Sequence, residues 1–519
     1  ITGCIDAQKS HMIYGIGNGR KNKVIVTFHE QKAKELYDDY RFFDPNAVYY
    51  PAKDVLFYQS DIRGNLLTAE RIRALRAIHE QQEVTVITTF DALMNTMAPP
   101  QTLWDSIQRI EPGDTVVLDE LVKCLVRMGY EKEYQVDTMG QFALRGGILD
   151  VFPLTEDNPV RIEMWGDEVD TIRSFDVESQ KSIENLDELV IYPACELVLD
   201  DEQKQVGIEH LLKEAKSFSA KLKKEMKTEE AHRALSMAQE LAEEWGELSV
   251  TAGMDAFLSY FCNERVGLLD YLDPSDSYLF FDELSRCVER GRQTEVEFAE
   301  SMKQRLEKGY ILLGQMKELF GLKEVMGRLE RYSCIAVAAL DVKTNGLKSN
   351  GQYGIHVKSV NAYNNSFELL IKDLQHYKKN SYRIILLSGS KTRAARLAED
   401  IMNEGLNCFY TDDYDHELLP GQIMVCYGKV RKGYEYPILQ FAVITETDIF
   451  GAERKKKKRH RTYEGEKIQS FTALNIGDYV VHENHGLGVY RGIEKIEVDH
   501  KVKDYIKIEY AGGSNLYIL

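Results

Sequence analysis

The alternation of strand and helix signals over the first 105 residues restricts the fold of this chain more than any other sequence feature. Residues 22–30 (NKVIVTFHE) and 83–90 (EVTVITTF) are apolar, β-branched runs typical of fully buried strands. Helical spacing marks residues 30–43 and 68–81, and a further helix is expected behind Asp91. Strands that alternate with helices predict a parallel sheet with right-handed crossovers.

A near-complete phosphate-loop motif stands at the start of the chain, where residues 3–10 read GCIDAQKS. The pattern G-x-x-x-x-G-K-[ST] fails only at Gln8, which replaces the second glycine. That glycine lets backbone N–H groups close around a phosphate, and a Cβ hinders this approach. Asp6 adds a carboxylate, and two negative charges ~4 Å apart repel by roughly 4 kcal/mol at an effective dielectric constant of about 20. We predict a degenerate, inactive nucleotide site, and no catalytic residue in the chain. Its residues are Gly3, Gln8, Lys9 and Ser10.

Two carboxylates, Asp282 and Glu283, follow an apolar strand in the stretch LFFDELSR. In an active nucleotide motor the aspartate would hold Mg²⁺ through water, and the glutamate would activate the attacking water. Without a phosphate cradle these groups have nothing to act on. We therefore assign them to the same inactive site, as a strand-end pair held by local hydrogen bonds, and expect no bound metal.

The character of the sequence changes several times after residue 105. Short strands separated by Gly, Pro, Asn and Asp indicate a small sheet-rich domain, and long charged helices follow whose charges are expected to form a solvated face without a ligand. A second α/β pattern, a basic low-complexity linker and a group of short strands complete the chain. The predicted segments are 1–105 (α/β domain, first part), 106–197 (sheet-rich domain), 198–335 (helical and α/β continuation), 336–452 (second α/β domain), 453–470 (basic linker) and 471–519 (small β-barrel).

The net charge of −18 excludes a protein that binds DNA over its whole surface, because phosphate contacts need clustered Lys and Arg. The eight cysteines are scattered without a C-x-x-C pair, which predicts reduced thiols in a cytoplasmic protein rather than a zinc site or a disulfide framework. No run of about 20 apolar residues indicates a membrane span. The chain starts at Ile1 and ends without a polar tail, so we expect a piece of a longer protein.

Three stretches of the sequence resemble one family of bacterial proteins. Residues 144–180 resemble the sheet domain shared by the excision-repair protein UvrB and the transcription-repair coupling factors, and residues 279–286 resemble their second nucleotide-binding motif. Residues 477–494 are similar to the RNA-polymerase-interacting domain of the coupling factors, which also occurs in CarD-type regulators. UvrB has no such domain after its first module, so the order of these stretches is that of a coupling factor.

The resemblance implies a multidomain α/β fold. Its parts would be a degenerate P-loop (RecA-like) parallel sheet with an inserted small α+β domain, a second α/β domain, and an incomplete C-terminal β-barrel of the CarD/Tudor-like kind. The parent family is an ATP-driven double-stranded DNA translocase, whose motor domains would lie outside this chain with their ATP, their Mg²⁺ and most DNA contacts. The remaining part would dock stalled RNA polymerase and recruit UvrA, as a monomer without a cofactor of its own.

The resemblance also implies a UvrA-binding surface at Arg145, Arg161 and Trp165. Arginine and aromatic residues are enriched in interface hot spots, and arginine makes forked hydrogen bonds to carboxylates. Arg161 and Trp165 lie four residues apart on an alternating strand, so both side chains are expected on one face. The structural alternative is that Trp165 belongs to the core and that the arginines are ordinary surface charges.

Residues 488–498 and 504–510 are the strands of the last domain that matter for polymerase binding. In the family this domain meets the polymerase β subunit by adding a strand edge to edge, which supplies main-chain hydrogen bonds. The resemblance implies contacts at Ile493, Lys495 and Ile496. Barrel core is the alternative for the two isoleucines.

Two local features have simpler explanations than a binding site. His482 and His485 have no third ligand nearby, so hydrogen bonding in a turn is favoured over zinc. The basic run 454–461 suits a linker, and contact with DNA is the alternative, which the salt dependence of binding would test.

Two rival functions remain open from the sequence. The first is a UvrB-like, nucleotide-dependent factor that verifies DNA damage. UvrB carries an intact P-loop and an aromatic β-hairpin that threads DNA, and the corresponding region here is short. The second is a CarD-like transcription regulator with an unrelated N-terminal half.

Overall fold

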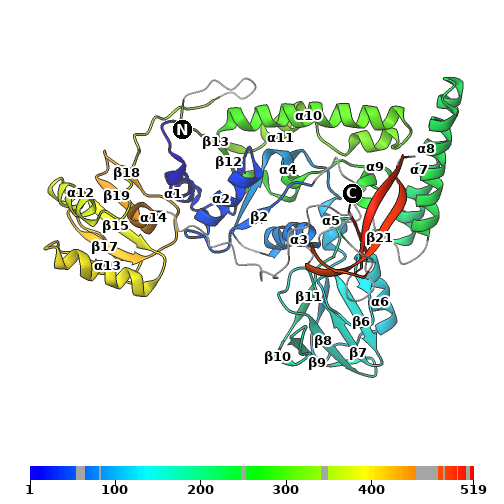
Figure 1. The fold of residues 1–519 in the computed structure, drawn as a ribbon, viewed down its shortest axis with the longest axis horizontal. Helices are drawn as coiled ribbons and strands as arrows, with labels where there is room; N and C mark the ends of the chain where they lie inside the picture. The colour runs from blue at the N-terminus through cyan, green and yellow to red at the C-terminus, as the bar shows by residue number, and fades with distance from the viewer. Residues whose placement is uncertain are drawn as a thin grey trace. The chain divides into compact units, whose positions relative to one another are not determined.

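The computed structural model describes residues 1–53, 65–80, 83–246, 253–340, 349–451, 477–482, 486–498, 501–509 and 515–518. The chain divides into two compact units, 1–451 and 452–519. Figure 1 labels the helices and strands. Within the described ranges, every helix is too short or too polar to cross a membrane.

Five parallel strands form the first sheet, in the order β13-β12-β1-β3-β2. The α/β class and the parallel sheet expected from the sequence are therefore confirmed. All residues of β1 and β3 are buried, because each of these strands has a neighbour on both sides and helices on both faces. The last two strands come from after residue 276, so the segments between are insertions into this sheet. The strands are β1 (Asn22–Thr27), β2 (Val48–Tyr50), β3 (Val84–Thr89), β12 (Ser277–Asp282) and β13 (Ser333–Val337).

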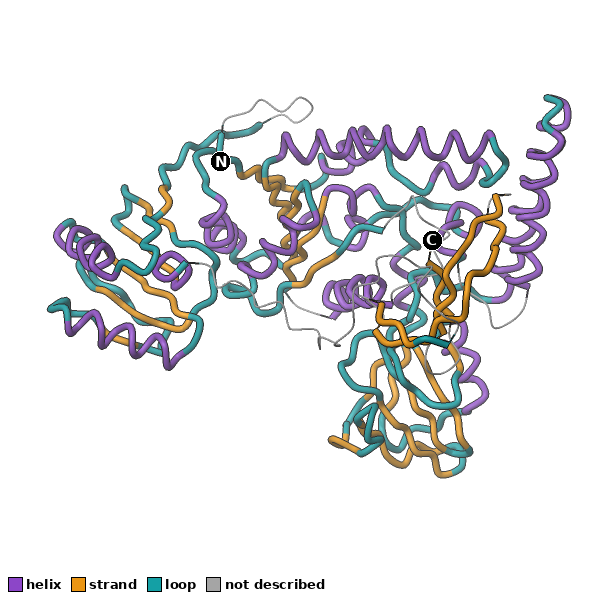
Figure 2. Tube along the Cα trace, in the orientation of Figure 1, coloured by secondary structure: helices purple, strands orange, loops and turns teal. Residues whose placement is uncertain are grey.

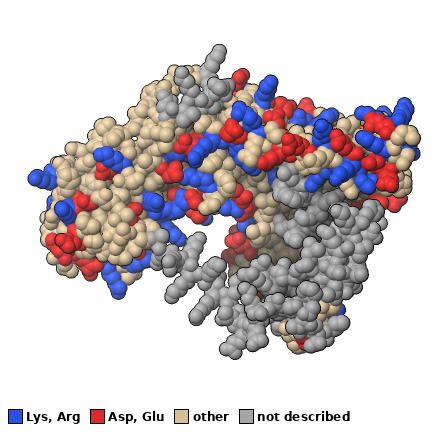
Figure 3. Space-filling view, turned by 45° about the horizontal axis from the view of Figure 1, so that its top comes forward, with Lys and Arg blue, Asp and Glu red and all other residues tan. Residues whose placement is uncertain are grey.

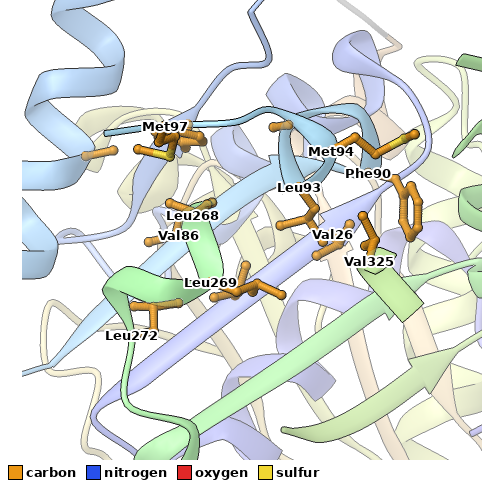
Figure 4. Close-up of a cluster of buried hydrophobic side chains, with 14 of the residues drawn as sticks. Val26, Val86, Phe90, Leu93, Met94, Met97, Leu268, Leu269, Leu272 and Val325 are labelled. Carbon is orange, nitrogen blue, oxygen red and sulfur yellow. Dashed lines mark hydrogen bonds between the residues drawn. The ribbon is translucent and has the colours of Figure 1, made fainter. Parts of the chain in front are cut away.

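Helices cover both faces of the first sheet. Along β1, Val24 and Val26 belong to a core shared with α3 and α10, and Ile25 belongs to a second core shared with α1 and α2. Figure 4 shows part of the first core, including Val26, Phe90 and Val325. The helices of this domain are α1 (Asp6–Gly17), α2 (Glu30–Tyr40), α3 (Asn65–Glu80), α4 (Phe90–Met94), α5 (Pro100–Trp104), α10 (Leu284–Glu307) and α11 (Leu322–Leu329).

The helix expected behind Asp91 is present but short, and it begins before Asp91, at Phe90. Its cap is Thr89, whose hydroxyl accepts a backbone N–H of the first turn at 3.3 Å. Asp91 serves α10 instead, where its carboxylate accepts from Arg290 at 2.9 Å and from Thr294 at 2.8 Å. The predicted start was wrong because the threonine at the strand end supplies the cap.

A six-stranded sheet is inserted between β3 and β12, in the order β10-β9-β8-β7-β6-β5. One face packs on α6, and Figure 2 shows how rich in strands this part is. The chain enters this inserted domain through β4 and leaves it through β11. These two strands pair with each other, and Gln108 lies opposite Ile191. A buried ion pair fixes the exit, with Arg71 Nε 2.5 Å from Glu196 Oε1. The elements are β4 (Gln108–Ile110), α6 (Leu118–Arg127), β5 (Glu131–Lys132), β6 (Gln141–Arg145), β7 (Ile148–Val151), β8 (Val160–Trp165), β9 (Glu168–Phe175), β10 (Ser182–Asn185) and β11 (Leu189–Ile191).

Two long helices, α7 and α8, follow the inserted sheet and pack against each other along their length (Figure 1). α7 begins with a capping box, in which the Asp200 carboxylate accepts the Gln203 N–H at 2.7 Å and the Gln203 amide accepts the Asp200 N–H at 3.1 Å. The buried Trp245 ring near the end of α8 packs against Phe257, with ring centroids 5.1 Å apart. The elements are α7 (Asp201–Lys224), α8 (Thr228–Gly246), η1 (Met254–Phe257), α9 (Leu258–Phe261), η2 (Leu268–Tyr271), η3 (Pro274–Asp276) and η4 (Leu313–Lys317).

The second α/β domain holds a mixed sheet in the order β14-β18-β19-β15-β17-β16. The strands β19, β15, β17 and β16 are parallel, and β18 runs antiparallel between β19 and β14. α13 begins behind Ser390, whose hydroxyl accepts the Arg393 N–H at 3.2 Å. The elements are β14 (Lys358–Ser359), α12 (Phe367–Lys379), β15 (Arg383–Ser388), α13 (Lys391–Asn403), β16 (Phe409–Tyr410), β17 (Ile423–Tyr427), β18 (Tyr434–Tyr436), β19 (Phe441–Thr445) and α14 (Glu446–Phe450).

The described part of the second unit is an antiparallel meander, β20-β21-β22-β23. A bulge between Tyr490 and Gly492 interrupts the register of β21, and Gly492 takes a φ of +103° there. In the part of this unit that the structure describes, β20 and β23 do not pair, so the β-barrel stays a prediction. The segment boundaries expected from the sequence also stay predictions. The linker 453–470, the basic run 454–461 and His485 lie outside the described residues. The strands are β20 (Tyr479–His482), β21 (Gly486–Val498), β22 (Lys501–Glu509) and β23 (Asn515–Ile518).

Candidate functional site

The GCIDAQKS loop lies beside the carboxyl end of β13, next to the end of β12. Several of its backbone donors are already bonded. The Gly3 N–H donates to the Ala339 carbonyl at 3.2 Å, and the Cys4 N–H donates to the Ala338 carbonyl at 3.1 Å. In a working phosphate loop such N–H groups point at the ligand. A phosphate would therefore have to displace main-chain hydrogen bonds to enter this loop.

Gln8 fills the interior of the loop and hydrogen-bonds to its backbone. Its side chain is fully buried, and its amide oxygen accepts the Ile5 N–H at 3.1 Å. The Gln8 N–H in turn donates to the Ile5 carbonyl at 3.1 Å, so the first turn of α1 is capped by the residue that replaces the motif glycine. The substitution thus fills the place of the missing glycine with a buried hydrogen-bonding group. Ser10 is also buried within α1.

Lys9 is bound to the carboxylates at the end of β12. Its Nζ lies 2.5 Å from Asp282 Oδ1, 2.9 Å from Glu283 Oε1 and 3.2 Å from Asp6 Oδ1. Burial alone would lower the pKa of Lys9, but the charges of Asp282 and Glu283 outweigh it and hold this pKa above its ordinary value. Asp282 is fully buried and also accepts the Thr27 hydroxyl at 3.1 Å. The structure thus brings the motif lysine and both carboxylates together as one ion cluster.

Gly3 contacts the segment that leads to the second α/β domain. We call residues 353–355 the strap. Its Ile355 N–H donates to the Thr2 carbonyl at 2.9 Å, and the Thr2 N–H donates to the Tyr353 carbonyl at 2.9 Å. Gly3 has a φ of +83°, and a Cβ built on it would lie 2.1 Å from the Ile355 oxygen. The approach of the strap therefore requires glycine here, without any bound phosphate.

The inserted sheet brings Arg145 and Arg161 to one carboxylate, that of Asp150. Arg161 Nε and Nη2 donate to Asp150 at 2.6 and 2.8 Å, and Arg145 Nη2 donates to it at 2.9 Å. The three residues come from β8, β7 and β6, whose register sets Asp150 opposite Arg161. Asp150 is 1% exposed, so both arginines neutralise a buried negative charge. Sequence reasoning missed Asp150, although a lone carboxylate inside the apolar strand ILDV was a usable signal.

Trp165 lies at the end of β8 and is 83% exposed, so the expectation of a core position does not describe it. Residues of β8 alternate in burial, with Val160 and Ile162 inward and Arg161 outward. The same alternation puts Arg161 and Trp165 on the outward row. The tryptophan is therefore a large apolar side chain that no part of the described chain covers well.

Two hairpin turns meet beside Trp165. The Met164 N–H donates to the Gly147 carbonyl at 2.8 Å, which joins the β6–β7 turn to the end of β8. Tyr134 is also 83% exposed, and the Arg145 guanidinium lies 5.9 Å from its ring centroid. We call Tyr134, Arg145 and Trp165 the aromatic tip. Tyr134 was missed from the sequence because it follows no periodic pattern.

In the second unit, the three residues assigned to polymerase contact lie on β21. Ile493 pairs with Ile506, Lys495 with Asp504 and Ile496 with Lys503, all on β22. On the opposite edge, no strand among the described residues pairs with the backbone from Ile493 to Val498. His482 lies on β20 opposite Gly486. In the described ranges, no three His, Cys, Asp or Glu side chains gather in a way that could hold a metal ion.

Two family models match the chain. One, described as the UvrB interaction domain, matches residues 109–197, and the other, described as the CarD-like/TRCF RID domain, matches residues 474–518. The first covers the inserted sheet with the aromatic tip, and the second covers the meander. These are the two regions in which partner-binding residues were expected.

Curated relatives match across both regions. The transcription-repair-coupling factor of Bacillus subtilis (strain 168) is 30% identical over 498 residues, which cover 95% of this chain and 42% of that protein. The family resemblance inferred from the sequence is thereby confirmed. Coupling factors of Staphylococcus haemolyticus (29%; 96% of this chain, 42% of that protein) and Staphylococcus aureus strain Mu50 (28%; 100% and 44%) are similar in the same way. The chain thus spans less than half the length of these coupling factors.

Proposed function

We propose that this chain is the docking part of a transcription-repair coupling factor, and that it binds stalled RNA polymerase and recruits UvrA to start repair. The observation that carries the proposal is the presence of a UvrB interaction domain and a CarD-like/TRCF RID domain on one chain. The matches to coupling factors run through both domains, which does not favour a CarD-like regulator with an unrelated N-terminal half. The parent protein would be an ATP-driven DNA translocase with its motor outside these residues.

The aromatic tip is the proposed UvrA contact. An exposed tryptophan costs free energy in water, and large exposed apolar side chains mark protein interaction sites. Arg161 stabilises the strands under this surface through its ion pair with Asp150. Arg145 pairs with Asp150 as well, but its side chain is 42% exposed and also reaches the surface. We assign recognition to Trp165 and Arg145, and we assign to Arg161 the task of holding the strands that carry them.

For RNA polymerase, the edge of β21 from Ile493 to Val498 is the proposed contact. Strand addition needs a row of backbone groups without a neighbouring strand, and this edge offers one within the described residues. We propose the polymerase β subunit as the partner, with Lys495 as the basic residue in the row.

The GCIDAQKS loop is proposed to descend from a P-loop and to bind no nucleotide. The support is that the Gly3 and Cys4 N–H groups already donate to the Ala339 and Ala338 carbonyls, together with the ion cluster around Lys9. This proposal sets the chain apart from a UvrB-like enzyme. ATP hydrolysis that disappears on Lys9→Ala would instead favour that enzyme.

The deciding experiment mixes the chain with UvrA and, separately, with the N-terminal region of the polymerase β subunit, and follows co-elution. Trp165→Ala should weaken UvrA binding by about tenfold or more, because loss of a hot-spot aromatic costs about 2 kcal/mol, and should leave polymerase binding unchanged. Tyr414→Ala, at another exposed tyrosine (54%), is the matched control and should change neither affinity. Binding of the unaltered chain to neither partner would reject the proposed function.

A further inference from the structure

The outer face of α7 carries a group of lysines. Helical residues recur at about 100° per position, so Lys213, Lys216, Lys223 and Lys224 fall within an arc of about 100°. They span eleven positions, or roughly 16 Å along the axis. The opposite side of the helix is the buried one, through Leu211, Ala215, Phe218 and Leu222. We call Lys213, Lys216, Lys221, Lys223 and Lys224, all of which are exposed, the lysine face.

Acidic side chains flank the lysine face at Glu209 and Glu225, but few lie within it. Between His210 and Lys224 the only acid is Glu214, and its carboxylate accepts the Tyr260 hydroxyl and the Gly314 N–H, each at 3.1 Å. Glu214 is thus turned toward the interior. Among the ion pairs of the described residues, none involves a member of the lysine face. Over the surface drawn in Figure 3, by contrast, acidic and basic side chains are largely intermixed.

Helix stability explains only part of this arrangement. Lysines in the last turn are favoured by the helix dipole, which accounts for Lys221, Lys223 and Lys224. The effect fades beyond one turn, and Lys213 and Lys216 lie two to three turns before the end. Like charges on neighbouring turns repel each other. In a chain with a net charge of −18, such a concentration of positive charge calls for another explanation.

We propose that the lysine face binds the phosphate backbone of duplex DNA. The duplex carries one negative charge per about 1.7 Å, so a row of ammonium groups roughly 16 Å long can meet several phosphates. Flexible lysine side chains form such contacts without reading bases. This function goes beyond docking of UvrA and polymerase and does not depend on either. It gives this part of the protein its own contact with DNA.

The test measures binding of a short fluorescein-labelled DNA duplex to the whole 519-residue chain by anisotropy, over a series of KCl concentrations. Lys455, Lys456, Lys457 and Lys458 are replaced by Gln in every protein, so that the basic run within the linker does not mask the result. The triple variant Lys213→Glu/Lys216→Glu/Lys223→Glu should bind about tenfold or more weakly at low salt. The slope of log K against log salt should become shallower by about 2–3, since each phosphate contact contributes about 0.9.

A matched control separates the lysine face from net charge. The variant Lys372→Glu/Lys378→Glu/Lys379→Glu changes the charge of α12 by the same amount and should leave DNA binding within about twofold. The variant Lys213→Gln/Lys216→Gln/Lys223→Gln removes charge without adding repulsion and should give a similar change of slope, with unchanged helix content by circular dichroism. The proposal is overturned by equal losses in both Glu variants, by no DNA binding at all, or by polyglutamate competing as well as DNA.

Discussion

At the residue scale, the surroundings of Lys9 explain how a nearly complete phosphate-loop motif can serve another purpose. The lysine is retained, but its ammonium is bonded to Asp282, Glu283 and Asp6, so the positive charge is neutralised within the protein. Taking a carboxylate out of water is costly unless a partner is held close. Lys9 is that partner for Asp282, and this requirement is independent of ATP.

Lys9→Met should therefore lower the free energy of unfolding by about 3–5 kcal/mol, because Asp282 would stay buried without its counter-charge. Lys34→Met is the matched control. The pair Lys34–Glu30, at 2.7 Å, is exposed and should contribute about 0.5 kcal/mol or less. Guanidinium denaturation followed by circular dichroism compares the two variants. Equal stability of both would contradict a structural role for Lys9.

Arg161 is the second residue whose contacts bear on its proposed role. The sequence treats it as an interface hot spot together with Arg145 and Trp165. In the structure its guanidinium donates twice to the buried Asp150 and lies 4.6 Å from the Phe175 ring centroid. Loss of UvrA binding in Arg161→Ala would thus report a disturbed sheet as well as a lost contact. Trp165→Ala, which removes an exposed ring, is the cleaner probe.

At the element scale, the strands with continuous apolar runs could be predicted, and the contacts between distant segments could not. β1, β3 and β15 follow from β-branched runs whose burial on both faces leaves little choice of structure. The pairing of Thr2 with Gly354 joins segments far apart in the sequence, and no local pattern marks it. The lysines of α7 were interpreted as part of a solvated face, since only the structure shows that Glu214 turns inward, away from them.

The strap provides a test at this scale. Gly3→Ala should weaken pairing of the strap, because the new Cβ would overlap the Ile355 oxygen, which lies 2.1 Å from its position. Gly19→Ala is the matched control, since Gly19 has the same φ of +83° and nothing within 4 Å of a Cβ. Both variants bear the backbone strain, of order 1 kcal/mol, but only Gly3→Ala bears the clash.

Hydrogen exchange reports the outcome directly. The amides of Thr2 and Ile355, which are bonded across the strap, should exchange faster in Gly3→Ala than in Gly19→Ala. Equal protection of these amides in both variants would show that the loop tolerates a side chain at position 3, and would remove the strap as the reason for the glycine.

At the scale of the whole molecule, the division into units 1–451 and 452–519 predicts that the two partner contacts are separable. Residues 1–451 contain the aromatic tip and their own hydrophobic cores. This part alone should bind UvrA with the affinity of the full chain and should lose binding to the polymerase β subunit. Co-elution with each partner gives the comparison. A loss of both activities would mean that the C-terminal unit is needed for the fold of the first.

The pairing of β4 with β11, which joins the inserted domain to the first sheet domain, has a consequence for the evolution of such proteins. Because Gln108 and Ile191 face each other, the polypeptide returns to the place from which it departed. A module with adjoining ends can be gained, lost or exchanged by recombination while the surrounding strands keep their order. This gives a physical route by which one recognition module can serve proteins whose catalytic parts differ.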